Sequence, residues 1–323
     1  MAVIGLDLGG TKLAVALFAE DGALLYKERV PLAPLRGDAI GSLIIDQIKT
    51  IKNNFPETAI TGAGICIPGI YYARTGNVWC PNIKGWEQYP LGKQLSAACG
   101  SLPVVIDSDR ACYILGEAWK GVAQNCSNAI YLSVGTGIGA GILSGGTILR
   151  GQHDIAGAIG WMALSEPFQP LFKQYGCFEY SASGEGITRY AQELLTSMKA
   201  YTRPLKNSAG DRLTTQHIFE AFEQNDELAT AVIRHCIRFW GMAAANLVSL
   251  FDPEMIIFGG GVFGPAQKLI PEIREEAAKW AQPVSMPSVA FVPGSLGQDA
   301  GLYGAAALVL QKETGTSKTT HDQ

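Results

Sequence analysis

The sequence DLGGTK at residues 7–12 decides the fold, because an apolar run of strand-like length lies on each side of it. We expect residues 3–6 and 13–18 to form strands and the two adjacent glycines to make a tight turn between them. Glycine accepts positive φ and lets the backbone approach a ligand, so the N–H groups of such a turn can point at an anion. Thr11 adds a hydroxyl group and Lys12 a cation. An ordinary glycine hairpin has the same pattern, so the hexapeptide alone leaves both interpretations open.

The acidic residue of this stretch, Asp7, lies at the end of the first expected strand. Carboxylate oxygens and water are ligands that Mg2+ prefers. A carboxylate beside phosphate-binding groups repels the phosphate unless a cation lies between them. We therefore expect Asp7 to hold Mg2+ through water.

The composition describes a folded chain with the size of two domains. Its 323 residues include 47% hydrophobic and 17% charged residues, which allows a large core. The net charge of −4 and the lack of a long basic run argue against a nucleic-acid-binding surface. No apolar run reaches the roughly 20 residues of a membrane span, and no signal-peptide pattern is found. We expect a cytoplasmic protein that binds neither membranes nor nucleic acids.

The seven cysteines are scattered, odd in number and contain no CxxC pair. This spacing is typical of reduced, mostly buried thiols in a cytoplasmic protein. The cysteines are Cys66, Cys80, Cys99, Cys112, Cys126, Cys177 and Cys236.

The order of the expected elements repeats along the chain. Three strands, a helix and a strand are expected at residues 3–6, 13–18, 23–31, 39–54 and 60–67. This βββαβ order differs from the βαβ order of a Rossmann fold. The pattern begins again with strands at 129–134, 141–143 and 147–150 around the glycine-rich residues 135–141. We interpret the two parts as an internal duplication of the fold.

The other elements complete these two parts. We expect a loop at 71–86, helices at 90–99, 111–120, 180–200, 215–251 and 301–311, strands at 103–106 and 255–258, and a frayed polar tail from residue 312.

Three glycine turns each follow an expected strand: Gly9-Gly10-Thr11, Gly135-Thr136-Gly137 and Gly259-Gly260-Gly261. Within a duplicated βββαβ frame they resemble the phosphate-1, phosphate-2 and adenosine motifs of the actin/hexokinase/heat-shock chaperone superfamily. In that superfamily the sequence resembles the ROK family of sugar kinases and repressors over nearly its whole length. The resembling motifs are DLGGTK at 7–12, IPG at 67–69, PNIKGW at 81–86, VIDSDRACYILGEAWKG at 105–121, SVGTGIGAGILSGGTILRG at 133–151, AGAIGWM at 156–162, GCFEYSASG at 176–184 and SLGQDAGLYGAA at 295–306.

This resemblance implies an α/β protein with a duplicated ribonuclease H-like (actin-like ATPase) fold. Two lobes would enclose a nucleotide and sugar cleft: residues 1–120 completed by the helix at 301–311, and residues 121–300, with a polar tail at 312–323. The resemblance also implies an ATP-dependent sugar kinase that uses Mg2+, phosphorylates a hexose or hexosamine-like sugar, and forms a homodimer. Phosphoryl transfer asks the protein mainly to position the reactants and to offset phosphate charge.

The resemblance assigns residues to the nucleotide. Thr11 and Thr136 would contact the phosphates, and Gly260 and Gly261 would border adenine and ribose. A plain strand-to-helix turn would also contain such glycines. The implied nucleotide-binding residues are Gly9, Gly10, Thr11, Lys12, Gly135, Thr136, Gly137, Gly260 and Gly261.

Asp109 occupies the position of the family's catalytic aspartate, at the end of a strand where a sugar hydroxyl group would reach it. Its alternative role is the N-cap of the helix at 111–120, because Asp is a favoured N-cap residue. Asp107 and Ser108 would cap equally well, so capping does not single out Asp109. We favour Asp109 as the general base.

Several other positions match sugar-contacting positions of the family. Gly69 would line the pocket with its backbone, and Glu179 would contact the sugar. Asn82 matches a sugar-binding asparagine but is also an ordinary turn residue. Ser108 lies beside Asp109 in Asp-Ser-Asp, where the family reads Glu-Asn-Asp, so a shorter hydroxyl side chain replaces the sugar-binding asparagine.

The acceptor pocket departs further from the family pattern. The family sequence A-G-E-I-G-H supplies Glu and His to the sugar, whereas this chain has Ala158 and Trp161 at those positions. A sugar hydroxyl group that loses a carboxylate partner loses typically about 1.5–3 kcal/mol. We expect the identity of the acceptor to change while the transfer chemistry is kept. His153 lies close in sequence and would restore a donor, or it is an ordinary surface residue.

The family's zinc site needs that same His and three closely spaced cysteines, of which only Cys177 is present. One thiolate cannot complete a tetrahedral site, so we predict that zinc is absent. Trp161 with Phe168, Phe172 and Tyr175 would instead pack as a small apolar cluster. In an alternative interpretation, Trp161 stacks on a sugar face.

Three functions compete. The first is a sugar kinase with Asp109 as base, and the second is a sugar or nucleotide sensor with a decayed acceptor pocket. A sensor fits Ala158 and Trp161, but it has no chemical reason to keep a base beside magnesium and phosphate sites. The third is a repressor, which we do not expect, because the first strand begins at residue 3 and leaves no space before it for a helix-turn-helix.

Overall fold

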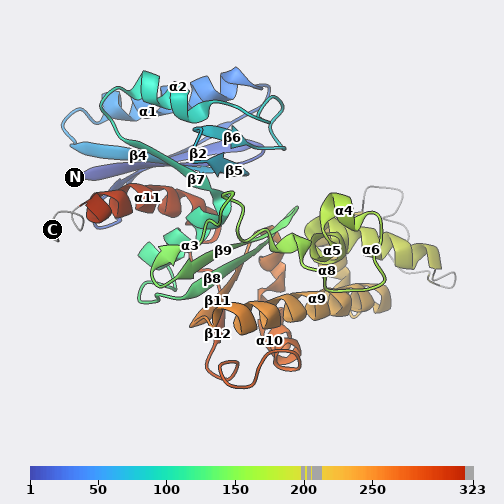
Figure 1. Cartoon of the computed structure of the whole chain (residues 1–323). Helices are drawn as coiled ribbons and strands as arrows, with labels where there is room; N and C mark the ends of the chain where they lie inside the picture. Colours follow the sequence, from blue (N-terminus) through green and yellow to red (C-terminus); the bar gives the residue numbers. More distant parts are fainter. Residues whose placement is uncertain (198–200, 202–204, 206–212, 317–323) are drawn as a thin grey trace.

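The structure is a computed structural model that describes the chain except for residues 198–200, 202–204, 206–212 and 317–323. It contains two five-stranded sheets. Helices α3 (Asp109–Lys120) and α11 (Ala300–Thr316) lie between the sheets (Figure 1). Helix α11 packs on the first sheet, and α3 packs on both α11 and the second sheet.

The two sheets share one connectivity. In the first, the strand order is β3-β2-β1-β4-β7, with antiparallel pairing among the first three strands in sequence and parallel pairing of β4 and β7. In the second, the order β10-β9-β8-β11-β12 repeats the same pattern. This repeat confirms the predicted duplication. The strands are β1 (Ala2–Leu8), β2 (Lys12–Ala19), β3 (Leu24–Pro31), β4 (Ile60–Ile67), β7 (Val104–Ser108), β8 (Ala129–Val134), β9 (Ile138–Ser144), β10 (Thr147–Ile148), β11 (Met255–Gly259) and β12 (Ala290–Pro293).

Strand β1 is buried on both faces, which explains its nearly continuous apolar sequence. Ile4 packs in one cluster with the apolar stripe of helix α1 (Asp38–Asn54), and Val3 packs in another with Leu302 of α11. Gly5 allows the close approach of α11, because a Cβ atom there would lie 2.5 Å from the carbonyl oxygen of Leu302. β1 therefore ends beside the beginning of α11.

Two further groups of elements surround the sheets. A small hairpin, β5 (Ile70–Tyr72) and β6 (Asn77–Trp79), lies near β7. Most of the helices come after β10 in the sequence and lie beside the second sheet (Figure 1). Among the described residues no helix is long and apolar enough to cross a membrane. The remaining helices are α2 (Leu91–Cys99), α4 (Phe172–Tyr175), α5 (Cys177–Ala182), α6 (Gly184–Ser197), α8 (Thr215–Glu223), α9 (Glu227–Phe251) and α10 (Ile270–Ala278), with 3-10 turns at Ile159–Trp161, Gly261–Phe263, Pro265–Leu269 and Gly297–Asp299.

The structure corrects several predicted boundaries. The expected loop at 71–86 contains most of the β5–β6 hairpin, which pairs further with Tyr89. The strand expected from residue 141 begins at Ile138, because the glycines of this run pair with β8. The expected helix at 215–251 is broken between α8 and α9, and the expected helix at 180–200 is broken at Ser183, with residues 198–200 outside the described part.

The C-terminal region also differs from the prediction. Helix α10 and strand β12 were not predicted, because their short apolar patterns lack a distinctive period. Helix α11 continues to Thr316, so the predicted frayed tail from residue 312 is wrong for its first turn, and residues 317–323 lie outside the described part. The predicted lobe boundary at residue 120 stays a prediction.

Candidate active site

The first glycine turn joins β1 to β2 as a compact loop. The amide of Gly9 donates a hydrogen bond to the carbonyl oxygen of Lys12 (2.9 Å), and the amide of Leu32 donates to the carbonyl oxygen of Thr11 (2.9 Å). The side chains of Thr11 and Lys12 are exposed. With Gly10 and Asn82, Thr11 lines a cavity of about 350 Å³. The turn is therefore both an ordinary hairpin and an anchored loop whose polar side chains face a cavity.

Asp7 lies at the end of β1 among groups that control its charge. Burial raises the pKa of Asp7 to about 6; a hydrogen bond from the Cys66 thiol opposes this rise, and the negative charge of Asp109 adds to it. A Cβ atom on Gly301 would lie 2.5 Å from Asp7 Oδ2, so the first turn of α11 faces the carboxylate closely. A partly buried carboxyl group near a second acid, at the start of a turn predicted to bind phosphate, has the chemistry that would suit a hydrated Mg2+.

Asp109 is the first residue of α3, directly after β7. Burial raises the pKa of Asp109, and the Arg110 charge opposes that rise. The hydroxyl group of Ser108 accepts a hydrogen bond from the amide of Ala111 (3.3 Å), so Ser108 is the N-cap. The alternative interpretation of Asp109 as the cap is therefore wrong, and its carboxylate is close enough to Asp7 for the two charges to interact.

The two neighbours of Asp109 are already engaged. Asp107 is 8% exposed and accepts from Arg150 Nε (2.9 Å) and Nη2 (2.6 Å), which joins the end of β7 to the segment after β10. Ser108 is also buried, and its hydroxyl group keeps one hydrogen for donation while its oxygen caps the helix.

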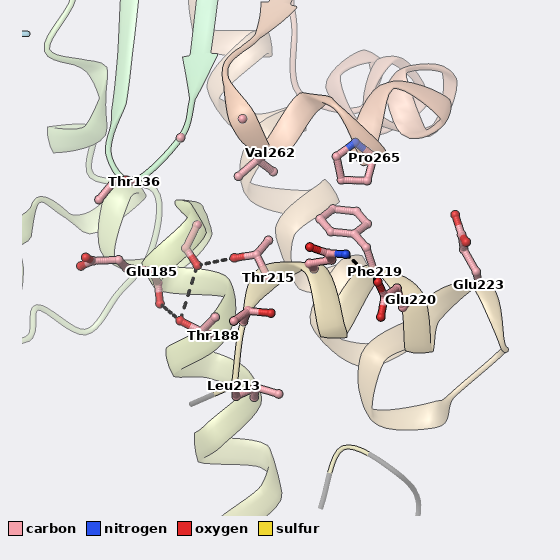
Figure 2. A pocket seen from close by; sticks show the side chains of 15 residues that line it. Thr136, Glu185, Thr188, Leu213, Thr215, Phe219, Glu220, Glu223, Val262 and Pro265 are labelled. Atoms are coloured by element: carbon pink, nitrogen blue, oxygen red, sulfur yellow. Dashed lines mark hydrogen bonds between the residues drawn. The ribbon is translucent and has the colours of Figure 1, made fainter. Parts of the chain in front are cut away.

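The second and third glycine turns border a cavity of about 840 Å³ (Figure 2). Gly135 accepts at its carbonyl oxygen from the amide of Gly184 (2.8 Å), which fixes the turn on helix α6. Gly260 has a φ of 86°, a conformation that favours glycine. Gly261 begins the next 3-10 turn. A cavity of this size is in the range of small-ligand pockets.

The rest of this cavity comes from residues that sequence reasoning missed. Figure 2 shows Thr136 at one side and, around the remaining space, side chains from α6, α8 and the segment after β11. Thr215 donates to the carbonyl oxygen of Gly184 (3.0 Å), as does Thr188 (3.5 Å). The missed lining residues are Gly184, Glu185, Thr188, Leu213, Thr214, Thr215, Gln216, Phe219, Glu220, Glu223, Val262 and Pro265.

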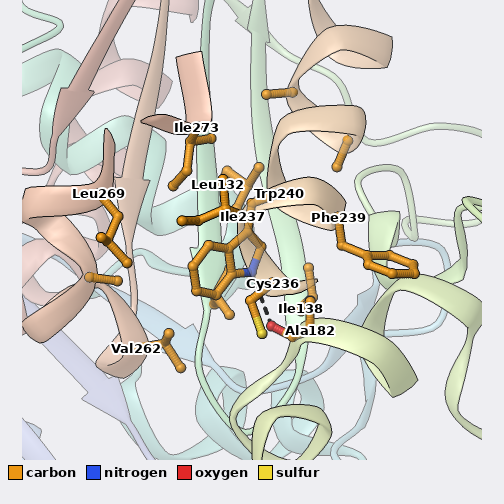
Figure 3. Close-up of a cluster of buried hydrophobic side chains, with 14 of the residues drawn as sticks. Leu132, Ile138, Ala182, Cys236, Ile237, Phe239, Trp240, Val262, Leu269 and Ile273 are labelled. Carbon is orange, nitrogen blue, oxygen red and sulfur yellow. Dashed lines mark hydrogen bonds between the residues drawn. The ribbon is translucent and has the colours of Figure 1, made fainter. Parts of the chain in front are cut away.

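The apolar core behind the cavity holds its walls in place (Figure 3). Val262 and Leu269 pack in the same cluster as Trp240 of α9, which is fully buried. The indole N–H of Trp240 donates to the carbonyl oxygen of Ala182 (3.0 Å), so α9 and α5 are connected through the core. The cavity wall after β11 is therefore part of a packed core.

Glu179 connects the second glycine turn to the segment at 157–161. Its Oε2 accepts from the amide of Ile138 (2.7 Å), and Cβ atoms on Gly137 and Gly160 would lie 2.8 and 3.0 Å from that oxygen. Burial raises the pKa of Glu179, and the hydrogen bond from Ile138 opposes the rise. The structure thus brings one predicted sugar residue onto the backbone of a predicted phosphate loop.

The other predicted sugar residues are more dispersed. Gly69 packs against β6, where any side chain would overlap the carbonyl oxygen of Trp79. Asn82 shares a cavity with Thr11, but this cavity and the 840 Å³ cavity have no lining residue in common. His153 and Trp161 are exposed, Trp161 at 56%.

The predicted aromatic cluster forms around Tyr180. Phe172 contacts both Phe168 and Tyr180 edge to face, and Tyr175 lies against Tyr180. Trp161 is outside these ring contacts, so the prediction is right for three aromatic residues and wrong for Trp161.

Cys177 Sγ lies 3.4 Å from Ser165 Oγ. Within the described residues no group of three His, Cys, Asp or Glu side chains could hold a metal ion.

Comparisons with known proteins agree over nearly the whole chain. The sequence matches the ROK family over residues 3–312. It is 32% identical to a glucokinase of Halalkalibacterium halodurans over 320 residues, 98% of this chain and 97% of that protein. It is 30% identical to an N-acetyl-D-glucosamine kinase of Haemophilus influenzae over 319 residues, 95% of this chain and 99% of that protein.

Solved structures give the same result. A ROK hexokinase from Thermus thermophilus matches with a TM-score of 0.79 and 29% identity, covering 98% of this chain and all of that one. A ROK family glucokinase from Streptomyces griseus, solved with glucose and AMPPNP, matches with a TM-score of 0.75 and 29% identity over 96% of this chain and 100% of that one. The chain belongs to the ROK family and has the duplicated actin-like ATPase fold that its glycine turns predicted.

Proposed function

We propose that the chain is an ATP-dependent sugar kinase that transfers the γ-phosphoryl group of ATP to a sugar hydroxyl group. The observation that carries this proposal is the pair of partly buried acids, Asp7 at the end of β1 and Asp109 at the end of β7, whose charges influence each other. The glucokinase and N-acetylglucosamine kinase relatives, and the neighbour with glucose and AMPPNP, support it.

The nucleotide would occupy the 840 Å³ cavity, with adenosine against the segment after Gly260 and the phosphates toward Thr136. Thr11 and Lys12 would contact the terminal phosphates from the opposite turn. Asp7 would hold Mg2+ through water, and the bound cation would offset negative charge on the phosphates. Burial raises the pKa of the Asp7 carboxyl group to about 6, so its ionised form is poorly solvated and would be stabilised by a bound cation.

Asp109 would act as the general base. Its carboxylate takes the proton of the acceptor hydroxyl group while that oxygen forms a bond to the γ-phosphorus and the bond to the β,γ-bridging oxygen breaks. The products are ADP and a sugar phosphate. Burial, which raises the pKa of Asp109, makes the ionised carboxylate a stronger base. Gly69, Asn82, Ser108 and Glu179 would orient the sugar around this base.

The test is ADP release with Mg·ATP across hexoses, N-acetylhexosamines, ketohexoses, and anhydro or deoxy sugars. Wild type would be compared with Asp109→Asn and with Asp46→Asn, a change of an exposed acid on α1. Turnover lost in Asp109→Asn and kept in Asp46→Asn supports the kinase. Absence of turnover with every sugar, while ATP still binds, favours a sensor with an altered acceptor pocket.

We infer the assembly and location from the same family membership. The protein would be a cytoplasmic homodimer without nucleic-acid or membrane partners. The seven cysteines are all free, which agrees with a reducing compartment. Light scattering coupled to gel filtration measures the oligomeric state directly, and a monomer at micromolar concentration would contradict the dimer.

A further inference from the structure

Two nitrogen atoms of the Arg110 guanidinium group are buried next to the proposed base without a partner. Nε and Nη2 are shielded from solvent and form no hydrogen bond with any residue that the structure describes. The residue as a whole is only partly buried, and its positive charge interacts with the negative charge of Asp109. Buried N–H groups normally donate hydrogen bonds to the protein or to a ligand. Nε and Nη2 therefore lack an acceptor among the described residues.

The position of Arg110 in α3 adds an unfavourable electrostatic interaction with the helix dipole. It is the second residue of a helix of 12 residues, and a helix N-terminus favours anions over cations. Asp109 accepts from the backbone amide of Arg110 (2.8 Å), not from its side chain. A partly buried cation at a helix N-terminus creates a concentrated positive field, which an anionic ligand would relieve.

The side chain of Arg110 extends toward the acceptor side of the site. A Cβ atom on Gly139 would lie 3.0 Å from Arg110 Cδ and 3.8 Å from the carbonyl oxygen of Gly157. Arg110 also lines a gap of about 10 Å³ together with Ser108 and Ala156. It does not line the nucleotide cavity. The unpaired group thus lies between the proposed sugar contact at Ser108 and the segment at 156–161.

A second arginine at the same gap, Arg150, uses the edge of its guanidinium group formed by Nε and Nη2 to bind a carboxylate. Its Nε and Nη2 atoms lie 2.9 and 2.6 Å from Oδ2 of Asp107. Arg110 has the same two nitrogens unpaired. This edge presents two parallel N–H groups, whose spacing matches the oxygens of a carboxylate or a phosphate.

We propose that Arg110 recognises an anionic group, a carboxylate in the first place, on the acceptor of phosphoryl transfer. The proposal rests on the kinase function above and deepens it: the substrate is a polyhydroxylated acid, such as an aldonic or uronic acid. Its hydroxyl group faces Asp109 while its carboxylate binds Nε and Nη2 of Arg110. A gap of about 10 Å³ holds a group no larger than one water molecule, so binding requires Arg110 or the segment at 150–156 to move.

The test compares wild type with Arg110→Met, which keeps the length without the charge, and Arg110→Lys, which keeps the charge without the fork. ADP release would be measured at constant ionic strength with glucose, galactose and mannose, with gluconate, glucuronate and galacturonate, and with glucose 1-phosphate and glucose 6-phosphate. Calorimetry would measure binding of the same compounds without ATP, and thermal melting would show that each variant folds.

We expect at least one carboxylated sugar to exceed its neutral counterpart by about tenfold or more in kcat/KM, because a charge-assisted pair contributes at this level. Arg110→Met should remove that advantage, with Arg110→Lys between wild type and Arg110→Met. Because the Arg110 charge also acts on Asp109, the diagnostic quantity is the ratio of kcat/KM for the carboxylated sugar to kcat/KM for its neutral counterpart. Preference for the phosphorylated sugars, lost in Arg110→Met, would assign the same anion subsite to phosphate.

Equal effects of Arg110→Met on neutral and anionic acceptors, or no binding of any anionic compound to wild type, would overturn the proposal. The kinase function is judged separately. Anion binding that depends on Arg110 without turnover of any acceptor would keep the subsite and reject the kinase. Turnover of neutral sugars alone, with Arg110→Met unaffected, would do the reverse.

Discussion

Glu179 Oε2 lies 2.7 Å from the backbone nitrogen of Ile138, at the end of the second glycine turn. The same carboxylate adjoins the backbone of Gly160, so one side chain contacts both the proposed phosphate-binding turn and the segment at 157–161. Sugar and nucleotide binding are therefore expected to be coupled through Glu179.

Substitution of Glu179 tests this coupling. Glu179→Gln keeps an oxygen that can accept from Ile138, whereas Glu179→Ala removes it and leaves the amide of the buried Ile138 unpaired. A hydrogen bond to a charged group contributes about 1.5–3 kcal/mol, so Glu179→Ala should weaken ADP binding by about tenfold or more. Glu179→Gln should leave ADP affinity within about twofold and raise the KM for sugar instead.

Calorimetry with ADP and steady-state kinetics with sugar measure the two effects. Glu193→Gln is the control, because Glu193 lies on α6 and accepts a hydrogen bond from the Tyr180 hydroxyl group (3.4 Å). Equal ADP affinity in wild type and Glu179→Ala would show that the contact does not support the phosphate loop.

Gly301→Ala should disable the site without a change in any of the motif side chains. Alanine in a helix is usually more stable than glycine by about 1 kcal/mol. At this position the added Cβ atom would meet the carboxylate of Asp7, which must move or tilt α11. We expect Mg2+-dependent nucleotide affinity and kcat to fall by about tenfold or more.

The comparison for this variant is Gly264→Ala, whose Cβ atom would lie 3.5 Å from its nearest neighbour, an ordinary contact. ADP titrations with and without Mg2+ separate loss of the cation site from general unfolding. A Gly301→Ala protein with normal Mg2+ dependence would show that α11 does not form the wall of the Asp7 site.

His235 should make stability depend on pH. It stacks on Tyr190 and lies against Phe239, and burial lowers its pKa to about 4, assisted by the charge of Arg238 and opposed by a hydrogen bond with the Ser181 backbone. The unfolded state binds this proton more tightly, so the contribution to stability is complete above pH 6.5 and is lost as pH falls toward 4. The loss should be about 2 kcal/mol after allowance for partial exposure.

Urea unfolding of wild type and His235→Phe between pH 4.5 and 7.5 measures this slope. Phenylalanine keeps the ring stack and cannot take up a proton. His153→Gln, a change of an exposed histidine, is the control. If wild type and His235→Phe lose stability in parallel, His235 is not the responsible group.

Arg189 should stabilise the region where the family has zinc. Its guanidinium group lies 4.1 Å from the ring centre of Tyr180 and 5.2 Å from that of Tyr175, and it donates to the carbonyl oxygen of Tyr180 (2.7 Å). Arg189→Met should lower the free energy of unfolding by about 1–3 kcal/mol, since both the cation–π contact and the hydrogen bond are lost.

A chelator provides the matching experiment. Treatment with 1,10-phenanthroline should leave the melting temperature of wild type unchanged, whereas Arg189→Met should lower it. A fall in melting temperature with the chelator, reversed by zinc, would contradict the prediction that zinc is absent.

The parts of the site that sequence predicted are those with a backbone requirement. Gly260 needs a positive φ, and a Cβ atom on Gly9 would lie 3.3 Å from the carbonyl oxygen of Lys12, so both positions left glycines that can be recognised. Asp109 was assigned through the resemblance to the family, and its place after a short apolar strand agreed with that assignment. Such features are local, and local constraints are visible in one sequence.

The missed parts depend on helices from distant segments. Thr188 of α6 and Phe219 of α8 line the cavity proposed to bind the nucleotide, and their residue types are ordinary for helices. The cap of α3 could not be assigned, because three adjacent residues were all suitable and only the geometry selects Ser108. Arg110 also carried no signal, since its lack of a partner is a tertiary property.

The contact between Asp7 and Gly301 sets an order of events during synthesis. Asp7 is translated long before α11, the helix that faces it and covers β1. Until α11 has been made, the first sheet has one apolar face uncovered, because contacts so distant in sequence form late. The proposed cation site is thus assembled only after α11 has been translated, and a nascent chain that stalls before α11 would have its first two glycine turns but no wall for Asp7.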